Sequence, residues 1–151
     1  MEQFDREKAQ RVWKRVQGER NPPPVNVGPA QILQPNPEGL LLGELTDLRL
    51  LQQLSRGSQE PALRQLTAQA QSRAAVLKGI CRLMSLTGPG ELPKIDTKEP
   101  SAALRRLMGG LLRRYREYRH LCDQEEFGVL YHSLARQTQE SAVLLARLIG
   151  K

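Results

Sequence analysis

Few residues of this chain have the type and spacing that chemistry requires. The two cysteines, Cys81 and Cys122, lie in helical patterns without metal-type spacing, so we expect free, buried thiols. We expect His120 and His132 at the surface, the first near the end of a helix and the second off an apolar seam. There is no phosphate-binding glycine loop, no Cys-x-x-Cys motif, and no Ser or Cys that the sequence can pair with a histidine base. The chain is therefore not expected to be an enzyme.

Arginines are the other chemically distinctive group. The chain has a formal net charge of +7 at pH 7, and basic surfaces attract nucleic acids and acidic membranes. In a helix expected over residues 101–122, Arg105, Arg116 and Arg119 cluster on one edge, and Arg106 and Arg113 lie beside them. This face could bind nucleic acid or another anion. Amphipathic helices commonly carry charge on their outer face, however, and no nucleic-acid motif or aromatic interleaving is present, so this is the less favoured interpretation.

The composition indicates one all-α domain. A chain of 151 residues is long enough for one domain with its own core. Aromatic residues make up only 4%, while the helix-favouring Leu, Ala, Gln and Arg are abundant. Apolar runs are far shorter than the roughly 20 residues that cross a bilayer, and the N-terminus lacks the apolar segment of a secretory signal. We therefore expect a cytoplasmic protein without a membrane span.

The N-terminal part is expected to lie outside the main helical body. Residues 1–18 are predicted to form a short amphipathic helix, and its apolar face could dock on the protein's own bundle or on a partner. Residues 19–38 are interpreted as a proline-rich linker, because prolines favour extended backbone. The side chains of the predicted apolar face are Phe4, Val12, Trp13 and Val16.

Residues 39–151 are predicted to form a four-helix bundle. Apolar residues recur three or four positions apart, which is typical of helices with one buried face. The long connection over residues 86–100 contains glycines and prolines and exceeds a tight helical hairpin. This order predicts two helical hairpins joined by a long crossover, with Ser101 as the N-cap of the third helix. The expected helices cover about residues 37–56, 60–85, 101–122 and 125–149.

Gly109 and Gly110 are unusual inside a helix, because each glycine there costs about 1 kcal/mol relative to alanine. The glycine pair either permits the close approach of another helix beside Leu111 or kinks its own helix, and the sequence favours neither interpretation.

The second and fourth helices are similar in sequence. Residues 66–77 and 134–145 share Leu, Gln, Gln, Ala and Leu at a constant offset. A shift of one residue also aligns the first helix with the third, which matches Glu44 with Leu111. The bundle is therefore predicted to consist of two related hairpins about a pseudo-twofold axis.

With this helix order and repeat, residues 39–150 resemble the rubrerythrin branch of the ferritin-like superfamily. Residues 66–83 and 134–150 are similar to that family's second and fourth helices. In such di-iron bundles the first and third helices each supply a Glu, and the second and fourth each supply a Glu-x-x-His pair. The resemblance puts these ligand positions at Glu44, Ala70, Arg73, Leu111, Thr138 and Ser141. It therefore implies a degenerate di-iron site that holds no metal, because of these residues only Glu44 is a suitable ligand.

The resemblance also places Arg73 opposite Glu44. A buried carboxylate needs a partner to stay ionised, so we predict a buried Glu44–Arg73 ion pair in which the guanidinium replaces the metal cation. Thr138 or Ser141 should complete its hydrogen bonds. The other half of the site, at Ala70 and Leu111, should be packed with apolar side chains. In the alternative, Arg73 reaches solvent and Glu44 stays at the rim.

The function that these features predict is a metal-free, ferritin-like structural or protein-interaction module. It should need no cofactor, and a protein partner or a homodimer is expected. One alternative is a rubrerythrin-type di-iron oxidoreductase or iron-binding protein with unusual ligands. The other is the nucleic-acid or anion binding described above.

Overall fold

The computed structural model describes residues 36–151, which contain four α-helices and no strand. The all-α class predicted from the sequence is confirmed for this part of the chain. None of these helices is long and apolar enough to span a membrane. The helices are α3 (Pro37–Arg56), α4 (Pro61–Leu83), α5 (Pro100–Leu121) and α6 (Gly128–Ile149).

Proline begins α3, α4 and α5, because the first turn of a helix does not use the N–H that proline lacks. Pro37 and Glu38 are therefore part of α3, as in the helix expected over residues 37–56, and not of the linker predicted for residues 19–38. The N-cap predicted at Ser101 is wrong for the same reason: Pro100 opens α5, and Glu99 is the residue before it.

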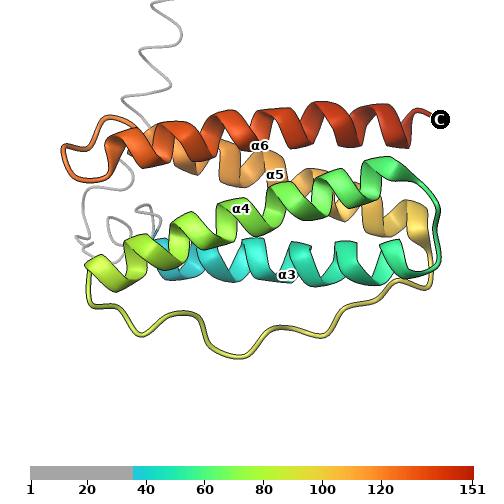
Figure 1. Cartoon of the computed structure of the whole chain (residues 1–151), viewed down its shortest axis with the longest axis horizontal. Helices are drawn as coiled ribbons and strands as arrows, with labels where there is room; N and C mark the ends of the chain where they lie inside the picture. Colours follow the sequence, from blue (N-terminus) through green and yellow to red (C-terminus); the bar gives the residue numbers. More distant parts are fainter. Residues whose placement is uncertain (1–35) are drawn as a thin grey trace, which may run out of the picture. The chain divides into compact units, whose positions relative to one another are not determined.

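The helices form two antiparallel hairpins, α3 with α4 and α5 with α6 (Figure 1). The hairpins meet through α4 against α6 and α3 against α5. Between α4 and α5, residues 84–99 carry the chain back along the length of α3, as the yellow segment in Figure 1 shows. Leu86 and Ile95 of this connection pack against the core. Each helix thus has an antiparallel neighbour on two sides.

The core of the bundle is apolar toward both ends and polar in the middle. Along α3, Leu41 belongs to one apolar cluster and Leu50 to the other, with buried polar residues between them. The other three helices show the same order, so the polar residues meet in one region, the central polar layer. Its buried members are Glu44, Asp47, Arg73, Arg114, Thr138 and Ser141, together with the hydroxyl of buried Tyr118.

Candidate functional site

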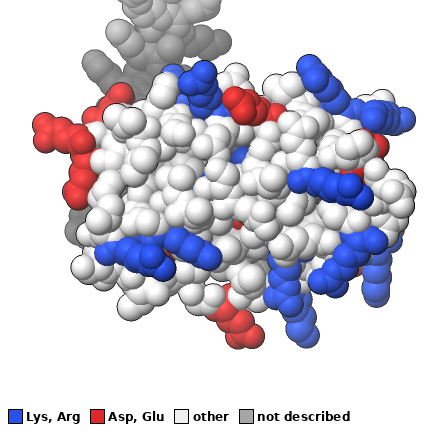
Figure 2. All heavy atoms as spheres, in the orientation of Figure 1, with Lys and Arg blue, Asp and Glu red and all other residues white. Residues whose placement is uncertain are grey.

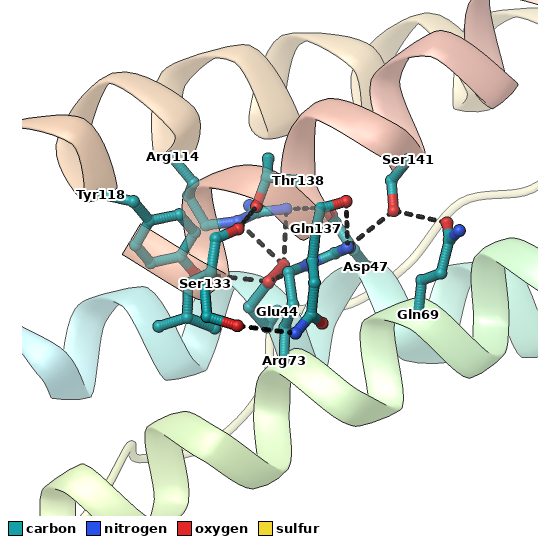
Figure 3. Close-up of polar contacts among 11 residues, drawn as sticks. Glu44, Asp47, Gln69, Arg73, Arg114, Tyr118, Ser133, Gln137, Thr138 and Ser141 are labelled. Atoms are coloured by element: carbon teal, nitrogen blue, oxygen red, sulfur yellow. Dashed lines mark hydrogen bonds and ion pairs between the residues drawn. The ribbon is translucent and has the colours of Figure 1, made fainter. Parts of the chain in front are cut away.

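Glu44 and Arg73 contact each other in the central polar layer (Figure 3). Their exposed fractions are only 0% and 1%. The Nε of Arg73 donates a hydrogen bond to Oε2 of Glu44. The ion pair expected from the sequence is therefore present and buried, and the alternative in which Arg73 reaches solvent is wrong.

A second buried arginine, Arg114 of α5, binds the same carboxylate. Its Nε donates a hydrogen bond to Oε1 of Glu44 at 3.1 Å, and its Nη2 donates one to Oδ2 of Asp47. Asp47 lies one turn after Glu44 on α3, so a single guanidinium can reach both carboxylates. Two guanidinium charges thus balance two carboxylate charges, and buried ions are tolerated only with such pairing.

Hydroxyl groups complete the central polar layer. Ser141 Oγ accepts a hydrogen bond from Nη1 of Arg73 at 2.6 Å and donates one to Oε1 of Gln69 at 2.6 Å. The hydroxyl of Tyr118 donates to Oε2 of Glu44 at 3.3 Å. Within residues 36–151, no buried polar side-chain atom of the layer lacks a hydrogen-bond partner. The layer joins all four helices through hydrogen bonds.

The remaining ligand positions implied by the resemblance make no hydrogen bond to the ionic side chains. The hydroxyl of buried Thr138 donates to the backbone carbonyl of Leu134 at 2.7 Å. Of the two hydroxyls expected to assist the guanidinium, it is therefore Ser141 that does so. Leu111 and Ala70 are buried in one of the apolar clusters, as predicted.

Burial changes the acidity of three groups in the layer. It raises the pKa of Asp47, although the charge of Arg114 acts in the opposite direction. It also raises the pKa of Tyr118, and the negative charge of Glu44 raises it further. For Arg114, burial alone would lower the pKa, but the charges of Glu44 and Asp47 outweigh burial and raise it. At neutral pH the arginine is therefore a fixed cation and the tyrosine an intact hydroxyl donor.

Two glycines give Arg114 its space. A Cβ on Gly43 of α3 would lie 2.9 Å from Nη1 of Arg114, and a Cβ on Gly110 of α5 would lie 3.1 Å from the same atom. A Cβ on the preceding Gly109 would meet nothing within 4 Å. Gly110 thus permits the close approach of a guanidinium and not that of a neighbouring helix backbone.

Asp47, Arg114 and Tyr118 are members of the layer that the sequence pattern did not single out. The spacing of these residues in the sequence nevertheless indicates that they lie on buried helix faces. Glu44 and Asp47 are three residues apart, and Arg114 lies three residues after Leu111 and four before Tyr118. These intervals put the charged residues on the same buried seams as the apolar ones.

A di-iron centre does not fit this donor set. Each oxygen of the Glu44 carboxylate already accepts a hydrogen bond from a guanidinium, and Arg114 also binds Asp47. A guanidinium offers no lone pair to a metal, and its charge repels a cation. In the part of the chain that the structure describes, no group of three or more His, Cys, Asp or Glu residues could hold a metal ion.

Other candidate residues lie outside the layer. His120 and His132 are exposed, as predicted. Cys81 is a buried free thiol, as predicted, whereas the free thiol of Cys122 is only half-buried. The apolar face predicted at the N-terminus lies outside the described residues. The basic side chains predicted on one face of α5 are all exposed: Arg105, Arg106, Arg113, Arg116 and Arg119.

Comparison with protein-family models, curated proteins and solved structures finds no match for this chain. Its function is therefore inferred from two features of its own residues. One is the balanced ionic layer inside the bundle, and the other is the exposed row of arginines on α5.

Proposed function

We propose that this chain is a metal-free ferritin-like protein, related to the rubrerythrin branch, that acts as a structural or protein-interaction module. The observation that carries the proposal is the presence of two guanidinium groups in the central polar layer. Arg73 and Arg114 neutralise Glu44 and Asp47, which is the role of metal cations in a di-iron bundle. Because arginine stays protonated, this positive charge is permanent and cannot be exchanged.

The layer is suited to hold a structure and not to perform a reaction. Glu44 of α3 binds arginines from both α4 and α5, and Ser141 adds α6. Buried ion pairs often add little net stability, but in some proteins they fix the register of packed helices. The layer would then select one alignment of the four helices. As an interaction module, the protein would bind a partner or a second copy, with the apolar face predicted in residues 1–18 as the expected contact.

The alternative is a di-iron or iron-binding protein with unusual ligands. A metal ion could reach Glu44 only by displacing Arg73 or Arg114, because both carboxylate oxygens are already bound. Displacement would leave a buried guanidinium without its counterion, which is costly. The arginines therefore favour the metal-free interpretation.

Metal analysis of the purified protein tests this proposal. The full chain is produced in medium supplemented with iron and manganese, and its metal content is measured by inductively coupled plasma mass spectrometry. We expect far less than one metal ion per chain. We also expect the same melting temperature with chelator, Fe²⁺ or Mn²⁺, since only a ligand of the folded state would raise it.

A di-iron four-helix bundle purified in parallel is the positive control for metal loading. Stoichiometric iron or manganese in this chain, together with a metal-dependent rise in melting temperature, would overturn the proposal in favour of the di-iron alternative.

A further inference from the structure

The outer face of α5 carries a row of arginines that the central polar layer does not use. We call it the arginine face; its members are Arg105, Arg106, Arg113, Arg116 and Arg119, all exposed. At about 100° of rotation per residue, these side chains leave the helix within an arc of about 140°. From the first to the last they extend over about 21 Å of helix. The five charges therefore point to one side of the bundle.

These arginines have no carboxylate partners among residues 36–151. Every salt bridge found there involves other residues. Opposite charges three or four residues apart stabilise exposed helices, and like charges at this distance repel. Arg116 has Arg113 and Arg119 at that spacing on either side, and Glu117, four residues after Arg113, forms no salt bridge with it in the described residues. The folded chain thus keeps a set of mutually repelling charges that a bound polyanion would neutralise.

The exposed cations of α4 are arranged differently. Arg64, Lys78 and Arg82 also leave the helix on one side, but they are only three charges over about 27 Å, with about 21 Å of helix between Arg64 and Lys78. On the face over α4 and α6 in Figure 2, positive side chains lie mainly in a group at the lower left and over the right-hand part, with uncharged residues between these two areas. Since α4 and α5 do not contact each other, they occupy diagonal positions in the bundle. These three cations therefore offer a matched control for the arginine face.

The chemistry of the arginine face matches phosphate groups on a duplex. A guanidinium can donate two parallel hydrogen bonds to one phosphate. Proteins that bind single strands stack bases on aromatic rings, but the aromatic residues of α5 are the half-buried Tyr115 and the buried Tyr118, and neither is fully exposed. The exposed aliphatic residue within the row is Leu112, which is too little apolar surface for a helix that lies in a membrane interface.

We propose that the arginine face binds the phosphate backbone of double-stranded nucleic acid without reading its sequence. This goes beyond the proposed function and does not depend on it, because the arginine face lies outside the bundle and the central polar layer lies inside. Metal content and duplex binding can therefore succeed or fail separately.

Fluorescence anisotropy with a labelled DNA duplex of about 20 base pairs and the full chain tests this proposal. We expect binding at low salt that weakens as salt rises. If all five arginines contact phosphates, the logarithm of the association constant should fall with the logarithm of salt concentration with a slope of about −4.5.

The test variant is Arg113→Gln/Arg116→Gln/Arg119→Gln, and the control is Arg64→Gln/Lys78→Gln/Arg82→Gln, which removes the same charge from α4. The test variant should bind at least about tenfold more weakly at low salt, with a salt slope shallower by about 2.7. The control variant should keep most of the affinity and slope. Circular dichroism and melting temperature establish that both variants are folded.

Absence of binding at the lowest salt would overturn the proposal. Equal losses in the two variants would overturn it as well, because attraction would then follow net charge alone. Tighter binding to a single strand or to phosphatidylserine vesicles than to the duplex would also contradict it and would identify a different partner.

Discussion

Among single residues, Glu44 is the member of the central polar layer that binds both buried arginines. It is fully buried and accepts hydrogen bonds from Arg73, Arg114 and Tyr118. Without its carboxylate, two buried guanidinium groups would share only the charge of Asp47. Removal of this carboxylate should therefore destabilise the fold mainly through the charge imbalance and less through the lost hydrogen bonds, because an unpaired buried charge is more costly than an unmade neutral contact.

Replacing Glu44 with alanine should therefore lower the free energy of unfolding by about 3–5 kcal/mol. Urea unfolding followed by circular dichroism measures the change. The exposed Glu140 of α6 provides the control, since Glu140→Ala should change stability by no more than about 0.5 kcal/mol. An unchanged unfolding midpoint in Glu44→Ala would refute the view that the layer depends on this carboxylate.

For whole elements, the sequence predicts the helices better than their ends. The three-and-four spacing of leucines identifies each buried face, and the expected helix over residues 37–56 coincides with α3. The fourth helix was expected from about residue 125, but α6 begins at Gly128. The difference arises at Phe127, whose left-handed backbone (φ 64°) interrupts the helix. Such a conformation depends on the local turn. It does not change the spacing of the apolar residues, so that spacing does not show where the helix begins.

The central polar layer was predictable only in part. The Glu44–Arg73 pair could be anticipated because the resemblance places these two oppositely charged residues at ligand positions that face each other. The spacing puts Arg114 on a buried seam, but it does not show which carboxylates this arginine binds, since its place requires space beside Gly43 on another helix as well as beside Gly110 on its own. Helix periodicity describes one helix at a time and contains no such relation between helices.

Glycine substitutions test how tightly α3 and α5 enclose this arginine. A Cβ on Gly43 would lie 2.9 Å from Nη1 and 3.1 Å from Cδ of Arg114, whose guanidinium is held by Glu44 and Asp47. Gly43→Ala should therefore lower the free energy of unfolding by about 1–3 kcal/mol. Gly109→Ala, which meets no neighbour, should raise it by about 0.5–1 kcal/mol through helix propensity.

Both glycines lie inside helices, so the same substitution gains the same helix propensity at each, and denaturant unfolding compares them directly. A gain in both variants would mean that Arg114 moves aside freely and that the layer is not closely packed.

In the molecule as a whole, the buried interior holds several weak acids in their protonated form. Burial raises the pKa of Tyr118, of Tyr131 and of the Cys81 thiol. Tyr118 differs from the other two because it faces the carboxylate of Glu44, whose charge opposes the formation of a phenolate. Each of these groups therefore makes the stability of the bundle depend on pH in the alkaline range. For all three, the free energy of unfolding falls as pH rises.

The free energy of unfolding should therefore fall as pH rises above about 10, where the unfolded chain releases the Tyr118 proton and the folded chain keeps it. One such proton corresponds to about 1.4 kcal/mol per pH unit. At neutral pH, Tyr118→Phe should lower the free energy of unfolding by about 1 kcal/mol, because the hydrogen bond to Glu44 is lost. Above pH 10, the free energy of unfolding of this variant should fall less steeply with pH than that of the parent, by up to about 1.4 kcal/mol per pH unit. Urea unfolding at a series of pH values measures both effects, with Tyr115→Phe on the same helix as the control for loss of a hydroxyl. Equal alkaline slopes in the parent and Tyr118→Phe would show that the central polar layer does not hold this proton.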